Sequence, residues 1–160
     1  MEIRFAQSQD IPGILELLRQ IGRLHHNGRP DIFRENAQKY GASGVLSLLK
    51  NPRTPVFVAV AGDAVLGYAI CQLETVGQDP VLKDRTILYL DDLCVDEAHR
   101  GKHIGTQLHE AVCRYAKGRR CHSVTLNVWA FNEEALDFYT RMGMKPLKVV
   151  MESILEEGTC

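Results

Sequence analysis

The stretch DDLCVDEAHRGKHIGT, residues 91–106, decides the fold prediction. An apolar strand runs through a short loop into an amphipathic helix. Gly101 and Gly105 let a ligand approach the backbone closely, and the first amides of a helix lack hydrogen-bond partners. Together with the helix dipole they suit a phosphate or pyrophosphate, and Arg100 and Lys102 add positive charge. A plain tight turn remains the alternative for the loop taken alone.

Two common phosphate-binding motifs are absent from the chain. No G-K-[ST] follows the spacing of a Walker A loop, and the G-x-G-x-x-G fingerprint of dinucleotide-binding domains does not occur. A nucleotide-binding Rossmann domain is therefore a poor interpretation.

Strands and helices alternate around this stretch. Apolar periodicity predicts strands at residues 2–6, 56–61, 65–73, 86–95, 122–128 and 147–155. It predicts helices from residue 11 to about 25–28, once or twice within 29–51, and over 104–118 and 132–142. The expected helix-terminal residues are Asp10, Asp31, Ser43 and Gly143. This order indicates an α/β or α+β sandwich with a mixed sheet.

Composition limits the class of protein. The chain has 160 residues, 45% hydrophobic and 24% charged, which suits a single globular domain over residues 1–160. A net charge of −1 gives no overall field for nucleic acid or an anionic membrane, so neither partner is expected. The N-terminus lacks the apolar core of a signal peptide, and no apolar run is long enough for a transmembrane helix.

The spacing of the cysteines and histidines predicts neither a disulfide framework nor a metal site. The five cysteines, at 71, 94, 113, 121 and 160, form no C-x-x-C pair, so reduced thiols in a cytoplasmic protein are expected. The closest histidine pairs are His25 with His26 and His99 with His103, and no trio of ligands supported by a carboxylate is evident. No metal site is therefore predicted.

Two motifs in register resemble the GCN5-related N-acetyltransferase (GNAT) family. Residues 100–105, RGKHIG, resemble its acetyl-CoA loop [RQ]-x-x-G-x-[GA], with His103 in place of the middle glycine. Residues 132–144, NEEALDFYTRMGM, resemble its N-x-x-A-x-x-[FL]-Y-x-x-x-G-F pattern, with Met144 for the final Phe. The resemblance covers about residues 86–146. It implies a mixed, mostly antiparallel central sheet flanked by helices and splayed between the fourth and fifth strands.

The resemblance also implies which residues bind acetyl-CoA, the co-substrate. Backbone groups of Leu93, Cys94 and Val95 would pair with the pantetheine arm like an added strand. Asn132 would bond a pantetheine amide or cap its own helix. The pyrophosphate would lie on the loop residues Arg100, Gly101, Lys102, His103, Ile104, Gly105 and Thr106.

Three side chains are candidates for catalysis. Tyr139 would protonate the departing CoA thiolate, the alternative being a half-buried aromatic. Asp91 or Asp92 would take the proton of the amine or attract it, the alternative being an ion pair with Lys or Arg. In a regular strand the two carboxylates point to opposite faces, and a bulge changes that. In the polyamine-acetylating branch of the family, which this strand resembles, the acid stands at the position of Asp91.

The expected function is therefore acetyl transfer from acetyl-CoA to a primary amine of a small molecule, polyamine-like or an amino sugar, by direct attack in a ternary complex. The alternatives are a protein or peptide amine as acceptor, and a non-catalytic acyl-CoA-binding or regulatory domain. Residues 24–33 mix cationic, aromatic and acidic groups where the family builds its acceptor site. A homodimer is left open.

Overall fold

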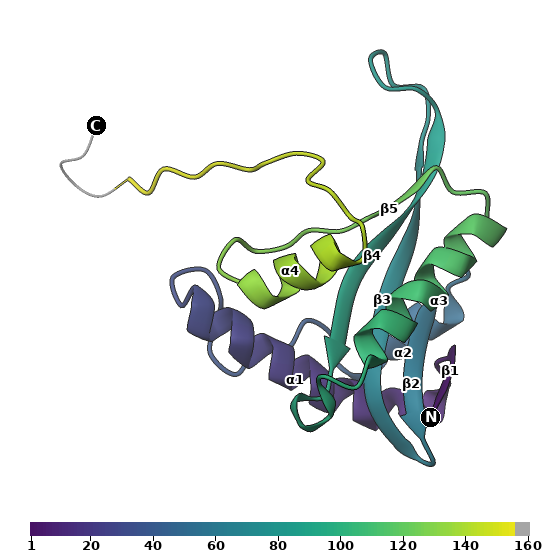
Figure 1. The fold of residues 1–160 in the computed structure, drawn as a ribbon, viewed down its shortest axis with the longest axis vertical. Helices are drawn as coiled ribbons and strands as arrows, with labels where there is room; N and C mark the ends of the chain where they lie inside the picture. Colours follow the sequence, from purple (N-terminus) through teal and green to yellow (C-terminus); the bar gives the residue numbers. More distant parts are fainter. Residues whose placement is uncertain (156–160) are drawn as a thin grey trace.

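The computed structural model describes residues 1–155 (Figure 1). Its strands are β1 (Glu2–Phe5), β2 (Val56–Ala61), β3 (Ala64–Val76), β4 (Arg85–Val95) and β5 (Ser123–Thr125). Its helices are α1 (Ile11–Gly28), α2 (Ala42–Lys50), α3 (Ile104–Gly118) and α4 (Glu133–Arg141), with short 3-10 helices at Ser8–Asp10 and Glu97–His99. The strands form one sheet in the order β1-β2-β3-β4-β5, antiparallel up to β4 and parallel between β4 and β5. The predicted fold class is confirmed.

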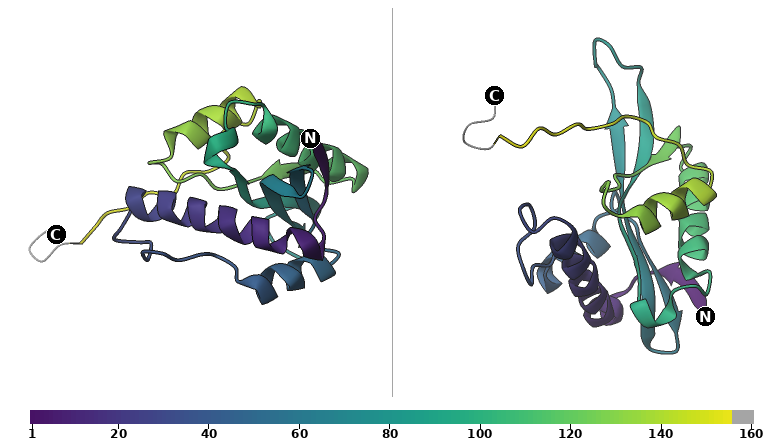
Figure 2. Two further views of the ribbon diagram at one scale, coloured as in Figure 1. Left: turned by 90° about the horizontal axis from the view of Figure 1, so that it is seen from below. Right: turned by 60° about the vertical axis from the view of Figure 1, so that its left-hand side comes forward.

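Helices cover both faces of this sheet (Figure 2). In β2, Val56 and Val58 are buried in a cluster with residues of α1 and α2. Phe57 and Ala59 are buried in the opposite cluster with residues of α3. A strand buried on both faces has a continuous apolar sequence, which is why β2 is predicted correctly.

A bulge in β4 reverses which residues face which layer. Cys71 of β3 pairs with Leu90, but Ile70 pairs with Asp92, so Asp91 has no partner on β3. Before the bulge, even-numbered Leu90 lies in the α3 cluster; after it, even-numbered Cys94 lies in the α1 cluster. One extra residue shifts the two-residue alternation by one position.

Asp10 is the N-cap residue of α1, as predicted, but its side chain makes no capping hydrogen bond to that helix. Its buried carboxylate accepts hydrogen bonds from the Arg4 guanidinium at 2.7 and 2.9 Å and from the Gln7 amide at 2.7 Å. The Arg4 hydrogen bond is the main reason that the pKa of Asp10 is lowered.

The segment between α1 and α2 is less helical than predicted. Residues 29–41 hold turns, and Asp31 pairs with Arg29 at 2.7 Å instead of capping a helix. The N-cap of α2 is Gly41 and not Ser43. Gly143, with φ +85°, does end the last helical segment as predicted.

The two C-terminal strand predictions also need correction. The fifth strand spans Ser123–Thr125, not residues 122–128, because it leaves β4 after three paired residues. Residues 147–155 form no strand; they run as an extended chain away from the body (Figure 1). A strand needs a neighbour to satisfy its backbone, and this segment has none among the described residues. None of the helices in residues 1–155 has the length and apolar composition needed to cross a bilayer.

Candidate active site

The site begins where β4 and β5 separate. The two strands pair only from Ile87 with Ser123 to Tyr89 with Thr125, and β4 continues six residues further, Leu90–Val95. The chain after β5 turns away towards α4 (Figure 1). This half of β4 therefore has β3 on one side and no strand on the other.

The free edge of β4 presents backbone groups at alternate residues. The Asp96 amide donates to the Leu66 carbonyl at 2.9 Å, which places the hydrogen-bonding groups of Cys94 towards β3 as well. Leu93 and Val95 alternate with them and direct their N–H and C=O groups to the open side. Within residues 1–155, Val95 O accepts two long hydrogen bonds, from Arg100 Nε at 3.4 Å and from Cys94 Sγ at 3.8 Å.

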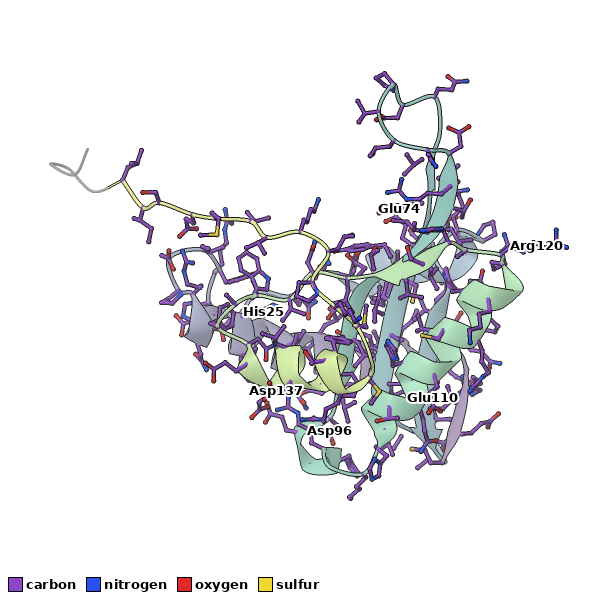
Figure 3. The ribbon with its side chains drawn as sticks, turned by 45° about the horizontal axis from the view of Figure 1, so that its top comes forward. His25, Glu74, Asp96, Glu110, Arg120 and Asp137 are labelled. Carbon is purple, nitrogen blue, oxygen red and sulfur yellow. The ribbon has the colours of Figure 1, made fainter. Side chains whose placement is uncertain are left out.

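The loop after β4 is fixed to α1. Asp96 accepts a hydrogen bond from Gln20 Nε2 at 3.0 Å and pairs with His99 Nδ1 at 2.5 Å. The Glu97 amide donates to Gln20 Oε1 at 3.2 Å. Figure 3 labels Asp96 beside the loop that leads into α3. These contacts hold the base of the loop in place.

The N-terminus of α3 carries a group of unbonded amides. No side chain caps this helix end, and the first amide with a helical partner is Gln107, which donates to His103 O at 3.1 Å. Within the described residues, the N–H groups of Ile104, Gly105 and Thr106 have no protein acceptor. With the positive end of the helix dipole, they form an anion-binding arrangement.

The loop backbone explains the residues found there. Gly101 has φ +75° and His103 has φ +60°, both in the left-handed region. A side chain in that region is strained, so the backbone conformation of His103 is less favourable than the same conformation would be for a glycine. A Cβ on Gly105 would lie 3.3 Å from the Phe138 ring, so this glycine lets α3 and α4 approach each other closely.

Asp91 and Asp92 both find partners on the α1 side of the sheet. Asp91 accepts hydrogen bonds from Lys39 Nζ at 2.7 Å and from the Tyr40 hydroxyl at 2.8 Å. Asp92 accepts one from the Tyr68 hydroxyl at 3.0 Å. Because of the bulge, neighbouring carboxylates serve one side, where a regular strand would separate them.

The environments of these groups change their protonation. Burial raises the pKa of Asp92 to about 6, even though the Tyr68 hydroxyl opposes the rise. Burial also raises the pKa of Tyr139, and the negative charge of Asp92 raises it further, so this phenol stays protonated at neutral pH. Tyr139 on α4 packs against the α3 cluster and against the buried His109 ring, 6.1 Å away between centroids. Burial lowers the pKa of that imidazole.

The loop from β5 to α4 rests on the end of α1. Phe131 of this loop and His25 of α1 meet edge to face at 6.3 Å, and Trp129 meets Phe33 edge to face at 4.9 Å (Figure 3 labels His25). A Cβ on Gly28 would lie 2.2 Å from the Phe131 ring, so the contact needs a glycine in α1. We call His25, Phe33, Trp129 and Phe131 the aromatic cluster.

The structure thus gives each predicted residue a place. Asn132 caps α4, accepting from the Ala135 amide at 3.1 Å. Cys94 lies between the two open residues of β4, with its side chain buried under α1, and burial raises the pKa of its thiol to about 12. Sequence reasoning missed Lys39, Tyr40 and Tyr68. The one signal that could have pointed to Tyr68 is its position opposite Cys94 on the neighbouring strand, and using it requires the register between β3 and β4 to be known.

Other chemistry has less support among the described residues. No three His, Cys, Asp or Glu side chains in residues 1–155 are grouped to hold a metal ion. Cys71, Cys94, Cys113 and Cys121 are free thiols, and Cys160 lies outside the described residues. A hollow of about 330 Å³ lies at the opposite end of α3 from the loop, lined in part by Arg53, Arg119 and Arg120.

Comparison with known proteins identifies relatives across most of the chain. The model of the acetyltransferase (GNAT) family matches residues 16–144. A thialysine N-epsilon-acetyltransferase of Bos taurus is 27% identical, covering 91% of this chain and 84% of that protein. An uncharacterized N-acetyltransferase of Methanocaldococcus jannaschii is 29% identical over 64% of this chain, which spans only 44% of that protein's length.

A solved structure agrees with the whole arrangement. A mutant of the BH1408 protein from Bacillus halodurans is 32% identical and superposes with a TM-score of 0.94. The match covers 98% of this chain and 100% of that one.

Proposed function

The chain belongs to the acetyltransferase (GNAT) family, and we propose on that basis that it transfers the acetyl group of acetyl-CoA to a primary amine of a small molecule. Family membership supports an acetyl-CoA-dependent acyltransferase. The class of acceptor and the role of each residue are argued from the geometry that follows.

The residues beside the open half of β4 fit acetyl-CoA. The N–H and C=O groups that Leu93 and Val95 direct to the open side suit the amides of the pantetheine arm. The unbonded amides at the start of α3 suit the pyrophosphate, with the exposed Arg100 and Lys102 beside them. Cys94 contributes through packing, since its backbone faces β3.

Asp91 provides a site for an ammonium group. Its two carboxylate oxygens already hold the Lys39 ammonium and the Tyr40 hydroxyl, both at hydrogen-bond distance. The Lys39 side chain is 46% exposed, so a substrate amine can displace it at little cost. The residue that the polyamine-acetylating resemblance singles out therefore has a binding role here.

Asp92 and Tyr139 suit the two proton transfers. A substrate ammonium must lose a proton before it attacks, and a carboxylate with a pKa of about 6 accepts one at neutral pH. The amine nitrogen then attacks the thioester carbon; the C–N bond forms and the C–S bond breaks. Tyr139 donates its phenolic proton to the departing sulfur and regains a proton from the amide nitrogen through solvent.

One observation carries the proposal: where β4 loses its β5 partner, a carboxylate with a raised pKa lies near enough to a protonated phenol for its charge to raise the pKa of that phenol. The first is on the α1 side of the sheet and the second on α4. A protein amine as acceptor is the second candidate, and the exposed Trp129 of the aromatic cluster is the feature that favours it. A purely acyl-CoA-binding domain needs neither Asp92 nor Tyr139.

The test is CoA release over a panel of amines. We expect turnover with polyamines, amino sugars or lysine analogues, and loss of turnover in Tyr139→Phe. The control is Tyr115→Phe, a tyrosine of α3 that packs on Phe5 and Phe57 away from the site. Turnover only with peptides would favour the second candidate. Tight acetyl-CoA binding with no turnover on any amine would exclude an enzyme.

A further inference from the structure

The ammonium group of Lys39 occupies the place that the proposed function gives to a substrate amine. Its Nζ lies 2.7 Å from a carboxylate oxygen of Asp91 and 3.5 Å from the Asp91 carbonyl oxygen. The Tyr40 ring lies beside it, with 5.8 Å between Nζ and the ring centroid. Of the lysines in residues 1–155, only Lys39 forms an ion pair. An amine of the protein itself is therefore bound at the candidate acceptor site.

The backbone around Lys39 is held against the body of the protein. A Cβ on Gly22 of α1 would lie 2.2 Å from the Ala37 carbonyl oxygen, so this glycine lets the segment approach the helix closely. Tyr40 packs against the buried cluster under α1, and its hydroxyl donates to Asp91 at 2.8 Å. One of these contacts precedes Lys39 in the chain and the other follows it. The position of Lys39 beside β4 is therefore built into the fold.

Lys39 also lies near the place expected for the thioester. In the proposed complex the pantetheine arm runs from the start of α3 back along β4, past Val95 and then Leu93. Asp91 is two residues further in that direction, about 7 Å along a strand. The positive charge of Lys39 is also close enough to Asp92 to oppose the rise in the pKa of that carboxylate, which burial causes. The ammonium is thus near both the expected thioester and the proposed proton acceptor.

We propose that Lys39 is itself an acetyl acceptor, which the protein acetylates when no small amine occupies the site. This inference rests on the proposed function. Asp92 takes a proton from the ammonium, and the neutral Nζ attacks the thioester carbon. The C–N bond forms, the C–S bond breaks, and Tyr139 gives its phenolic proton to the departing sulfur. The new amide nitrogen loses a proton that restores the phenol through solvent, and Asp92 releases its own proton. The products are acetyl-lysine, CoA and one proton.

Acetylation of Lys39 changes the binding of small amines. Unmodified Lys39 competes with a substrate ammonium for the Asp91 carboxylate. Acetyl-lysine has no charge, so it loses this ion pair and leaves the carboxylate to the substrate. Because the pair is partly exposed and weak, we expect KM for a small amine to fall a few-fold on acetylation, with kcat kept. The modification therefore increases the activity of the protein at low amine concentration.

Incubation of the purified protein with acetyl-CoA and no amine tests the proposal. Mass spectrometry should find an acetyl group at Lys39, present as purified or added by the incubation, and far less of it in Tyr139→Phe. Lys39→Arg should remove the modification, and Lys50→Arg, at the exposed end of α2, is the matched control. The rate per chain should not depend on protein concentration. Equal labelling in Tyr139→Phe, or a rate that rises with protein concentration, would overturn acetylation within one chain.

Turnover of small amines separates this inference from the proposed function. Turnover with no acetyl group at Lys39 overturns the inference alone, whereas absence of both turnover and label overturns the two together. Label at Lys39 without turnover of any added amine upholds the inference and overturns the small-molecule acceptor. Lys39→Gln, which lacks the charge as acetyl-lysine does, should lower KM for the amine a few-fold. An unchanged or higher KM would overturn the competition for Asp91.

Discussion

Replacing Asp92 by Asn should stabilise the protein at pH 7.5 and abolish most of its activity. The carboxylate is held in the folded protein with a pKa of about 6, against 3.8 for the free group, and burial is the main cause. Folding at neutral pH therefore has to bury a charge that water would solvate better. An amide of the same shape removes that cost and still accepts the Tyr68 hydrogen bond.

The rise in the pKa of Asp92 sets the size of the stabilisation expected for Asp92→Asn. A difference of about 2 pKa units corresponds to about 3 kcal/mol at a pH above both values. The new amide N–H₂ group needs acceptors of its own, which offsets about 1 kcal/mol. We expect a net gain of about 1–3 kcal/mol, or about 3–10 °C in Tm for a chain of this length.

The sign of the pH dependence provides the stricter test. Between about pH 4 and 6 the folded protein holds a proton on Asp92 that the unfolded chain releases, so stability falls as pH rises through this range. The advantage of Asp92→Asn should therefore be full above pH 6 and shrink towards pH 4. Urea unfolding of both proteins from pH 4.5 to 7.5 measures this directly. A constant difference, or a less stable variant at pH 7.5, would refute the argument.

Activity should follow the same titration. As the proton acceptor, Asp92 works when ionised, so kcat/KM should rise with pH up to about 6 and then level off. Asp91→Asn is the companion variant: it loses the Lys39 ion pair, about 0–1 kcal/mol, and should mainly raise KM for the amine. A larger loss of kcat in Asp91→Asn than in Asp92→Asn would mean that Asp91 accepts the proton and Asp92 binds the amine.

Three further predictions concern the loop and α4. Tyr139→Phe should lower kcat about 10²–10⁴-fold with little change in the Kd for acetyl-CoA, measured by titration calorimetry. His103→Gly should relieve the left-handed strain at φ +60° and bind acetyl-CoA a few-fold more tightly, whereas Arg120→Gly, at φ +55° beyond the far end of α3, should leave binding unchanged. Gly101→Ala, at φ +75° in the loop, and Gly62→Ala, at φ +59° in the turn between β2 and β3, should each lower stability by about 1 kcal/mol in thermal unfolding. Only Gly101→Ala should raise KM for acetyl-CoA.

The parts of the fold that depend on short-range patterns could be predicted from the sequence. Asn132 caps α4 and Gly143 ends it because both roles involve residues within one helical turn. Asp10 fails the same test because a partner on β1, Arg4, takes its carboxylate. A residue type favoured at caps does not reveal which competing donor lies nearby in space.

The candidate site depends on long-range pairing, which the sequence does not contain. The bulge at Asp91 follows from the way β3 pairs with β4, and no local property of the Asp-Asp pair requires it. Lys39 and Tyr40 reach Asp91 from a segment with no regular structure, 51–52 residues earlier in the chain. The strand expected at 147–155 has the composition of a strand, but its neighbour cannot be read from composition.

The bulge in β4 acts like a shift of reading frame along the strand. Upstream of it, even-numbered positions belong to one layer of the protein; downstream, they belong to the other. Deleting Asp91 would therefore differ in kind from substituting a later residue of β4, because it would remove the extra residue and leave a regular strand. Leu90 and Asp92 would follow one another as their partners Cys71 and Ile70 do, and every later side chain would keep its layer. The single inserted residue thus adds a second carboxylate on the α1 side without moving the residues that follow it.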